Sequence, residues 1–482
     1  TAWGQEILPA PNAVYAPLSA QNTLARLHRP LLRSDLKVSG SLSCAAANCH
    51  GGPQPGVARP TARRGSEYVL WLENDPHARS WQTLCSPESV AMMRRLGILR
   101  GTEIVDAEGY RNCLACHNST GHEHAGQGSG RSSPEIIREG VACSSCHGPS
   151  QHWRTLHYQD GWLTLSQSID GFVNTKDLYT RARMCAACHV GDEDRDVNHD
   201  IIAAGHPALR YEFASFHARQ PKHWRDATLD PAAFDAQLWL AGQIAAVDAS
   251  LARLHRQTRR SSHRVWPEFT AYNCASCHHS LGFPDEIDGT QRHPVARYSS
   301  WYESGLAWLL EYRAAAGEST TEGDELLIWM RRIKQQMEAS TVPDADGISN
   351  AAEQTRVLLA KWFDSRSVIL ERQRFDDQRL AKILAFAARD GDTFNTWETS
   401  AQFYLGARAT RRTWPRNSDG RALKESAQKL RIGLSYPDGF EIRRLREYDR
   451  DGENLSRSEA TILGRDIAGA LMRIHIPAAM SE

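Results

Sequence analysis

A cysteine pair followed directly by histidine recurs five times in this chain of 482 residues. Four copies have the form C-x-x-C-H: "CLACH" at 113–117, "CSSCH" at 143–147, "CAACH" at 185–189 and "CASCH" at 274–278. The first copy, "CAAANCH" at 44–50, has four residues between its cysteines. Ten of the eleven cysteines belong to these pairs. The chain must therefore fold around whatever these thiols and imidazoles bind.

This pattern is the attachment signature of c-type haem, in which two thiols bond to the porphyrin and the next histidine binds the iron. A zinc ribbon also uses C-x-x-C pairs but does not require the following histidine. Histidine fills 20 of 482 positions. The probability that histidine follows the second cysteine of all five pairs by chance is therefore on the order of 10⁻⁷. A thioredoxin-like redox pair fails the same test, and disulfides at this spacing would close only very short loops. We therefore predict five covalently attached haem c groups, each with its iron.

The motif positions predict which residues hold each haem. The attachment cysteines are Cys44, Cys49, Cys113, Cys116, Cys143, Cys146, Cys185, Cys188, Cys274 and Cys277, and the proximal iron ligands are His50, His117, His147, His189 and His278. In the first motif the small residues of "AAAN" allow the additional spacer to loop out. An alternative there is that Cys44 is unattached and Cys49 alone holds the haem.

The second axial ligand of each iron decides function, because an iron with both positions filled can only transfer electrons, whereas an open position can bind substrate. Fifteen histidines lie outside the motifs. Candidate distal ligands are His77, His122, His124, His152, His157, His199, His206 and His223. His217 and His279 are undecided, and we expect ordinary structural or surface roles for His28, His255, His263, His293 and His475.

Several stretches resemble a family of multihaem c-type cytochromes: "GVACSSCHGPSQHWRTLHY", "CAACHVGDEDRDVNHDIIAAGHPALRYEF", "PKHW" and "WPEFTAYNCASCHHSL". That family is related to the tetrahaem cytochrome that takes electrons from hydroxylamine oxidoreductase, and the nearest resemblance is to large versions from environmental bacteria such as planctomycetes. The resemblance covers roughly residues 40–300. It implies a haem-packed, mostly helical domain with stacked haem pairs and largely bis-histidine irons.

The resemblance also implies distal ligands. It favours His77, His157, His206 and His223, with His199 the weakest of the set. The chain departs from the tetrahaem plan by its fifth haem and by the widened motif at 44–50. Cys85, the cysteine outside the motifs, is interpreted first as a buried inert thiol, with an unusual haem ligand or a reactive group beside an open iron as alternatives.

The distribution of motifs predicts the domain organisation. All five lie before residue 279, and no cysteine follows Cys277. We predict a mainly α fold with little sheet: a pentahaem cytochrome domain at 1–300 and a haem-free helical domain at 301–482. Apolar periodicity predicts a long helix at about 232–256 that packs on haems. It also predicts amphipathic segments at 325–339, 351–364, 368–389, 394–412, 420–432 and 456–474.

Composition and motifs limit the possible partners and the cellular compartment of the protein. Lys plus Arg equals Asp plus Glu, 57 each, so no broad basic surface indicates a nucleic-acid partner. No apolar run reaches the roughly 20 residues that a membrane span needs. Haem is attached to such motifs outside the cytoplasm, so we expect a periplasmic or extracellular protein whose signal peptide has been removed.

The leading hypothesis is a soluble pentahaem cytochrome that carries electrons between redox partners through stacked, mostly bis-His haems. The alternative is a multihaem oxidoreductase that acts on a small nitrogen or sulfur compound at one open iron. The sequence contains no C-x-x-C-K motif and no clear catalytic cluster, so the electron carrier is favoured and no catalytic residue is assigned. A third hypothesis, compatible with the first, is that the helical domain docks the cytochrome into a larger complex.

Overall fold

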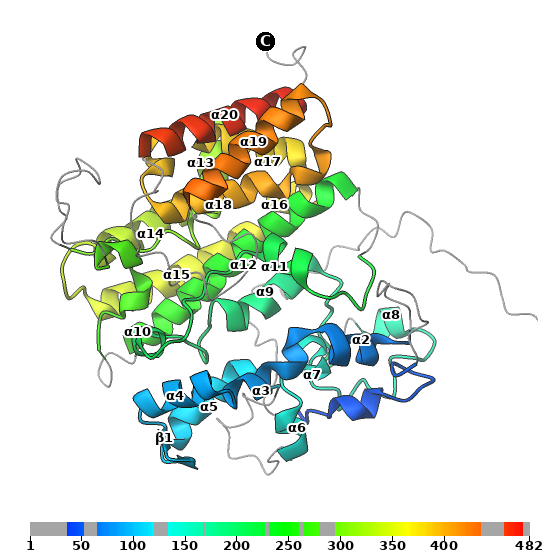
Figure 1. Ribbon diagram of the computed structural model, residues 1–482. Coiled ribbons are helices and arrows are strands. Elements are labelled where there is room, and N and C mark those ends of the chain that lie inside the picture. Colours follow the sequence, from blue (N-terminus) through cyan, green and yellow to red (C-terminus); the bar gives the residue numbers. More distant parts are fainter. Residues whose placement is uncertain are drawn as a thin grey trace, which may run out of the picture.

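The fold is mainly α, as predicted. The computed structural model describes residues 36–52, 65–119, 134–166, 169–226, 231–259, 265–278, 295–434 and 457–475. Within these ranges the strands are β1 (Leu99–Arg100) and β2 (Glu103–Ile104), which form one antiparallel hairpin. Figure 1 shows short helices from the first part of the chain on one side of the molecule and longer packed helices on the other.

The part that carries the first three motifs consists of short elements. They are η2 (Ser41–Cys44), α2 (Glu67–Asn74), η3 (Pro76–Arg79), α3 (Ser80–Leu84), α4 (Pro87–Arg95), α5 (Ala107–His117), α6 (Pro134–Arg138), α7 (Cys143–His147) and α8 (Trp162–Leu165). Side chains of Asp75, Ser86 and Asp106 cap η3, α4 and α5 by accepting backbone N–H groups of the first turn, which satisfies donors that a helix start leaves free.

The second part contains longer helices. After α9 (Leu178–His189), α10 (His199–Ala203) and α11 (Phe213–Arg219) come α12 (Pro231–Arg259), η4 (Phe269–Ala271) and η5 (Cys274–Ser276). The remaining elements are α13 (Ser304–Ala315), α14 (Thr321–Met337), α15 (Ala345–Asp364), α16 (Arg366–Arg374), α17 (Asp377–Ala387), η6 (Gly391–Phe394), α18 (Trp397–Ala409), η7 (Arg411–Thr413), α19 (Ser418–Gly433) and α20 (Arg457–His475).

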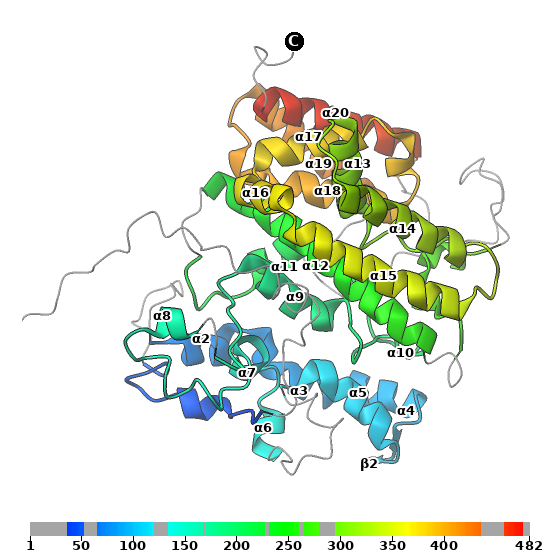
Figure 2. The same ribbon diagram turned by 180° about the vertical axis from the view of Figure 1, so that it is seen from behind.

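The long helix α12 is the centre of the larger hydrophobic core. It packs against α9, α11, α15 and α18, and Figure 2 shows α15 running beside it. Its side chains Trp239, Val247 and Leu251 are completely buried in the protein core, and contact of this helix with haems stays a prediction. The core contains residues on both sides of position 300, and the domain boundary there stays a prediction.

The periodicity of the second half predicts most of its helices. The exceptions have local causes. The segment predicted over 368–389 is two helices, α16 and α17, because Phe375 has an extended backbone and the Asp376 carboxylate accepts the backbone N–H of Arg379. Helix α13 was not predicted, because its buried residues lie on most of its faces and leave no single apolar stripe. Across the described ranges, no helix has the length and apolarity needed to cross a bilayer.

Candidate haem-binding sites

Each motif histidine lies opposite a second histidine. The ring centroids are 6.0 Å apart for His50 and His157, 6.1 Å for His189 and His77, 6.5 Å for His117 and His206, 6.3 Å for His147 and His223, and 6.2 Å for His278 and His199. The structure thus brings the five motif histidines and the five distal ligands implied by the resemblance into five pairs. Each pair joins a motif histidine to a histidine from a distant segment or another element.

These separations fit one iron between the two rings of each pair. A metal–imidazole bond is about 2.0 Å long. With ring bonds near those of other C–N bonds, the nitrogen lies about 1.1 Å from its ring centre. Two imidazoles on opposite sides of one metal therefore place their centroids about 6.2 Å apart, which is within the observed range of 6.0 to 6.5 Å.

Local helix geometry positions the thiols. Helices α5 and α9 each end at the histidine of their motif, and α7 consists of the third motif alone. Residues three apart on a helix share a face, so Cys113 and Cys116 point to the same side of α5. The motif spacing and the helix period together present two thiols and one imidazole to a single ligand.

The widened first motif closes in the same way as a regular one. In the fifth motif the backbone N–H of His278 donates to the carbonyl of Cys274 at 2.8 Å. In the first motif the N–H of His50 donates to the carbonyl of Cys44 at 3.3 Å. A tight turn, in which the N–H of Cys49 donates to the carbonyl of Ala46 at 2.8 Å, absorbs the two additional residues. This closure supports the interpretation that the first motif works like the others.

A hydrogen bond at Nδ1 orients five of the ten paired histidines. Nδ1 of His50 bonds Glu67 at 3.0 Å, Nδ1 of His77 bonds Asp75 at 2.8 Å, and the Nδ1 atoms of His117, His157 and His206 bond the carbonyls of Ser80, Arg154 and Pro207 at 2.9, 2.6 and 2.8 Å. Metal-binding histidines characteristically donate their other ring N–H to a carboxylate or carbonyl. Since these bonds use Nδ1, Nε2 is the ring nitrogen that would bind the metal.

Burial keeps several of these imidazoles neutral. It lowers the pKa of His147 to about 4 and that of His189 to about 3. It also lowers the pKa of His117, His206 and His223. Burial opposes the charging of His77 as well, but the hydrogen bond and charge of Asp75 raise its pKa overall. Since a metal binds the neutral imidazole, the lowered values favour ligation at neutral pH.

The attachment thiols show which motifs are neighbours. The thiol of Cys44 is within hydrogen-bonding reach of Cys143, and that of Cys116 is within reach of Cys188. Cys146 interacts electrostatically with thiols of the fourth motif. The first motif therefore lies beside the third, the second beside the fourth, and the third near the fourth.

The other described histidines do not lie opposite a motif histidine. His217 is buried, and its Nε2 is 2.9 Å from Nη1 of Arg181. His152 is exposed beside Gln151, His255 bonds Ser349, and His475 bonds Thr413. His28, His122, His124, His263, His279 and His293 lie outside the described residues.

Cys85 is exposed, so the interpretation of it as a buried thiol is wrong. It follows the short helix α3, in which Leu84 is the buried residue.

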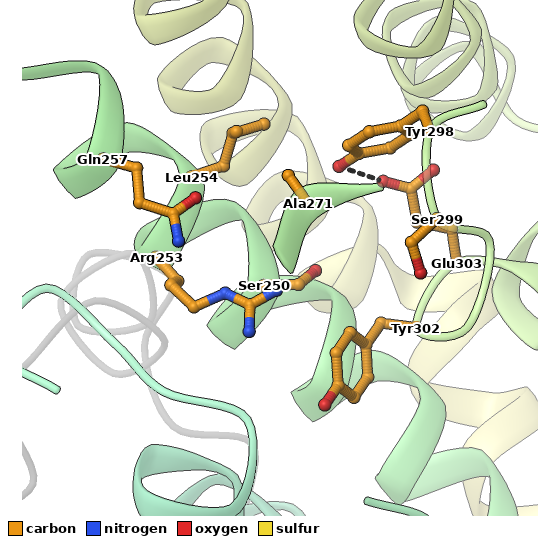
Figure 3. A pocket seen from close by; sticks show the side chains of 9 residues that line it. All are labelled: Ser250, Arg253, Leu254, Gln257, Ala271, Tyr298, Ser299, Tyr302 and Glu303. Carbon is orange, nitrogen blue, oxygen red and sulfur yellow. Dashed lines mark hydrogen bonds between the residues drawn. The ribbon is translucent and has the colours of Figure 1, made fainter. Parts of the chain in front are cut away.

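A separate small pocket lies beside the fifth motif (Figure 3). It has a cavity volume of about 20 Å³, is partly open to solvent, and lies between α12, η4 and the start of α13. The side chains of Arg253, Tyr298, Tyr302 and Glu303 line it, and the Tyr298 hydroxyl donates to Glu303 at 3.1 Å. Burial raises the pKa of Glu303 to about 7. None of the paired histidines lines this pocket.

Sequence reasoning missed the carboxylates that bond the paired histidines. Asp75 stands two residues before His77 in "NDPHARSW", so a local signal was present. Glu67 is 17 positions from His50, and only the fold brings the two together. Glu303 and Arg253 have no motif around them.

Comparison with known proteins gives one match. A family model described as "Cytochrome c554 and c-prime" matches residues 44–148, which contain the first three motifs. No curated protein and no solved structure matches the chain. The family match supports a c-type cytochrome that binds haem c covalently and functions in electron transfer.

Proposed function

We propose that this protein is a pentahaem c-type cytochrome that transfers electrons through five bis-histidine haems. The observation that carries the proposal is the pairing of every motif histidine with a second histidine at 6.0 to 6.5 Å. Bound haem supplies one-electron chemistry at its iron. The ten motif cysteines attach the porphyrins, the motif histidines are the proximal ligands, and His157, His206, His223, His77 and His199 are the distal ligands of the first to fifth haems.

Electron transfer accounts for the paired histidines better than catalysis does. An oxidoreductase acting on a small nitrogen or sulfur compound needs an iron with an open axial position. In this assignment an imidazole stands on each side of all five irons. The residues therefore hold the irons and exclude substrate from them, and their hydrogen bonds keep the ring orientation fixed.

The neighbouring motifs support an order for the haems. Thiols within hydrogen-bonding reach join the first motif to the third and the fourth to the second, and an electrostatic interaction between thiols links the third to the fourth. His199 and His206, seven positions apart around α10, belong to the fifth and second pairs. These contacts favour a series in the order first, third, fourth, second and fifth, with electrons entering and leaving at its ends.

The partners proposed are other redox proteins, a donor and an acceptor, in an extracytoplasmic compartment. The family match supports the compartment, since c-type cytochromes are typically extracytoplasmic. The proposed kinship to the partner of hydroxylamine oxidoreductase makes a nitrogen-oxidising donor the first to test. The helices from α13 onward are the proposed surface for docking into a larger complex, and neither nucleic acid nor a membrane span is part of the proposal.

Replacing one distal histidine tests the proposal. His206→Ala is expected to open the second iron, so that the reduced protein binds one carbon monoxide per chain and the ferric protein gains one high-spin signal of five. His217→Ala is the matched control, because His217 is also buried but bonds Arg181 instead of facing a motif histidine. Wild-type protein that already binds carbon monoxide would favour the oxidoreductase, and a His206→Ala variant that stays fully low-spin would overturn the pairing.

A further inference from the structure

We infer that two carboxylates, those of Glu67 and Asp75, lower the reduction potentials of the first and fourth haems below that of the second. The inference rests on the proposed function, because it requires an iron within the His50–His157 pair and another within the His77–His189 pair. It goes beyond that function by ranking haems that otherwise have the same two ligands.

The observation behind it is a difference in what the ligand histidines bond. In the first pair Nδ1 of His50 is 3.0 Å from Oε2 of Glu67, and in the fourth pair Nδ1 of His77 is 2.8 Å from Oδ1 of Asp75. In the second pair both histidines bond neutral carbonyls, those of Ser80 and Pro207, at 2.9 and 2.8 Å. The three haems thus differ by one negative charge next to one axial ligand.

Such a charge acts on the iron through the imidazole. A carboxylate that accepts the ring N–H makes the ring more basic and a stronger electron donor, as second-sphere partners of metal-bound histidines do. A stronger donor and a nearby negative charge both favour ferric iron over ferrous iron. Hydrogen bonding around an axial ligand is one of the means by which proteins set haem potentials. A neutral carbonyl has the same geometry but carries no net charge.

The two carboxylates differ in burial. The Asp75 side chain is 4% exposed and that of Glu67 is 22% exposed. Water and salt screen an exposed charge more than a buried one, so Asp75 should have the larger effect. Each carboxylate is also fixed by a backbone N–H, from His77 itself at 3.0 Å and from Gly65 at 2.9 Å. The expected ranking is the fourth haem lowest, the first next, and the second highest of the three.

This ranking places a low-potential haem inside the proposed series. The fourth haem lies between the third and the second, as the thiol contacts indicate. An electron moving from the second haem to the fourth would therefore cross an uphill step. Asp75 is in this sense a positioning and tuning residue for electron transfer, because it acts through its hydrogen bond to His77.

The test uses the complete holoprotein and removes each charge while keeping the shape of the side chain. Asp75→Asn and Glu67→Gln are compared with Asp177→Asn, the matched control. Asp177 caps α9, the helix that ends at His189, by accepting the N–H of Thr180 at 2.8 Å, and it bonds no ligand histidine. Redox titration followed by electron paramagnetic resonance reports the potential of each low-spin haem separately.

We expect one of five potentials to rise in Asp75→Asn by about tenfold in the reduction equilibrium constant, which corresponds to about 59 mV for one electron. A different potential should rise by a smaller factor in Glu67→Gln, and none should move in Asp177→Asn. Five unchanged potentials in Glu67→Gln, the more exposed and better tolerated site, would overturn the inference while leaving five low-spin haems and the proposed function intact. A wild-type protein with an open iron at either pair would instead overturn the proposed function.

Discussion

The two parts of the molecule fill their interiors differently. From α12 to α20 the helices share a continuous hydrophobic core that includes Trp239, Trp301, Trp362 and Phe403. Between residues 36 and 166 the separate described cluster is only Trp71, Ala78 and Ala142, with Tyr68 packed against it. The first part nevertheless has a defined arrangement of nine thiols and imidazoles from its first three motifs. Under the proposed function, porphyrins would supply the apolar interior that this part lacks, whereas the helical part stabilises itself.

Removing haem should have the largest effect. A variant in which all ten motif cysteines are serine should leave residues 36–166 without a core, because the buried side chains there are too few to offset chain entropy. Helices α12 to α20 should stay folded. Hydrogen exchange measured by mass spectrometry should show fast exchange in α2 and α5 and slow exchange in α12 and α15. Slow exchange throughout α2 and α5 of the haem-free chain would contradict the comparison.

A cavity in the helical part should be the next largest change. Leu251 on α12 is 0% exposed, so Leu251→Ala should lower the free energy of unfolding of this part by about 2–5 kcal/mol. Ile328→Ala on α14, where the side chain is 62% exposed, should change it by less than about 0.5 kcal/mol. Urea unfolding followed by circular dichroism and by haem absorption measures both parts. If Leu251→Ala shifts both signals equally, the two parts unfold as one unit.

The pocket beside the fifth motif predicts a pH dependence. Burial raises the pKa of Glu303 from 4.5 to about 7. The folded state then holds a proton that the unfolded state has released, so stability declines as pH rises from about 4.5 to about 7 and levels off above that. The decline should be on the order of 3 kcal/mol. Thermal unfolding of Glu303→Gln across this range should show a flatter profile than the wild type, and an equally steep profile would exclude Glu303 as its source.

Helix caps should show the smallest difference. Asp376 caps α17 in the helical part, and Asp106 caps α5 in the haem-carrying part. Asp376→Ala should cost about 1 kcal/mol of stability. Asp106→Ala should cost less, because bonds from Cys113 and Cys116 to a porphyrin would hold α5 in place without its cap. Urea unfolding of the two variants compares them, and an equal loss would mean that haem attachment does not stabilise α5.

The sequence predicts chemistry better than it predicts arrangement. The motifs can be recognised in the sequence because haem attachment requires a fixed spacing of cysteines and histidine. Apolar periodicity locates helices such as α14 and α15. The resemblance implied five distal ligands among the eight candidates, and the structure places each of the five opposite one motif histidine. Which histidine faces which depends on contacts between distant segments: His77 precedes the second motif yet lies opposite the histidine of the fourth. No local pattern carries that information.

Other features of the structure could not be predicted from the sequence, because they depend on tertiary packing. Glu67 meets His50 only through the fold. The place of α12 in the protein core could not be predicted, because an apolar helix face packs equally well on porphyrin or on other helices. Exposure of Cys85 depends on where a short helix ends. These outcomes are decided by tertiary packing, which periodicity in a single segment does not report.

The central claim is that each motif histidine shares an iron with its facing histidine. Intact mass together with electron paramagnetic resonance of the ferric, fully matured protein tests it most directly. The account predicts a mass increase of five haems, five low-spin irons and no binding of carbon monoxide after reduction. A protein with fewer than five attached haems, or with a high-spin iron that binds carbon monoxide, would contradict it.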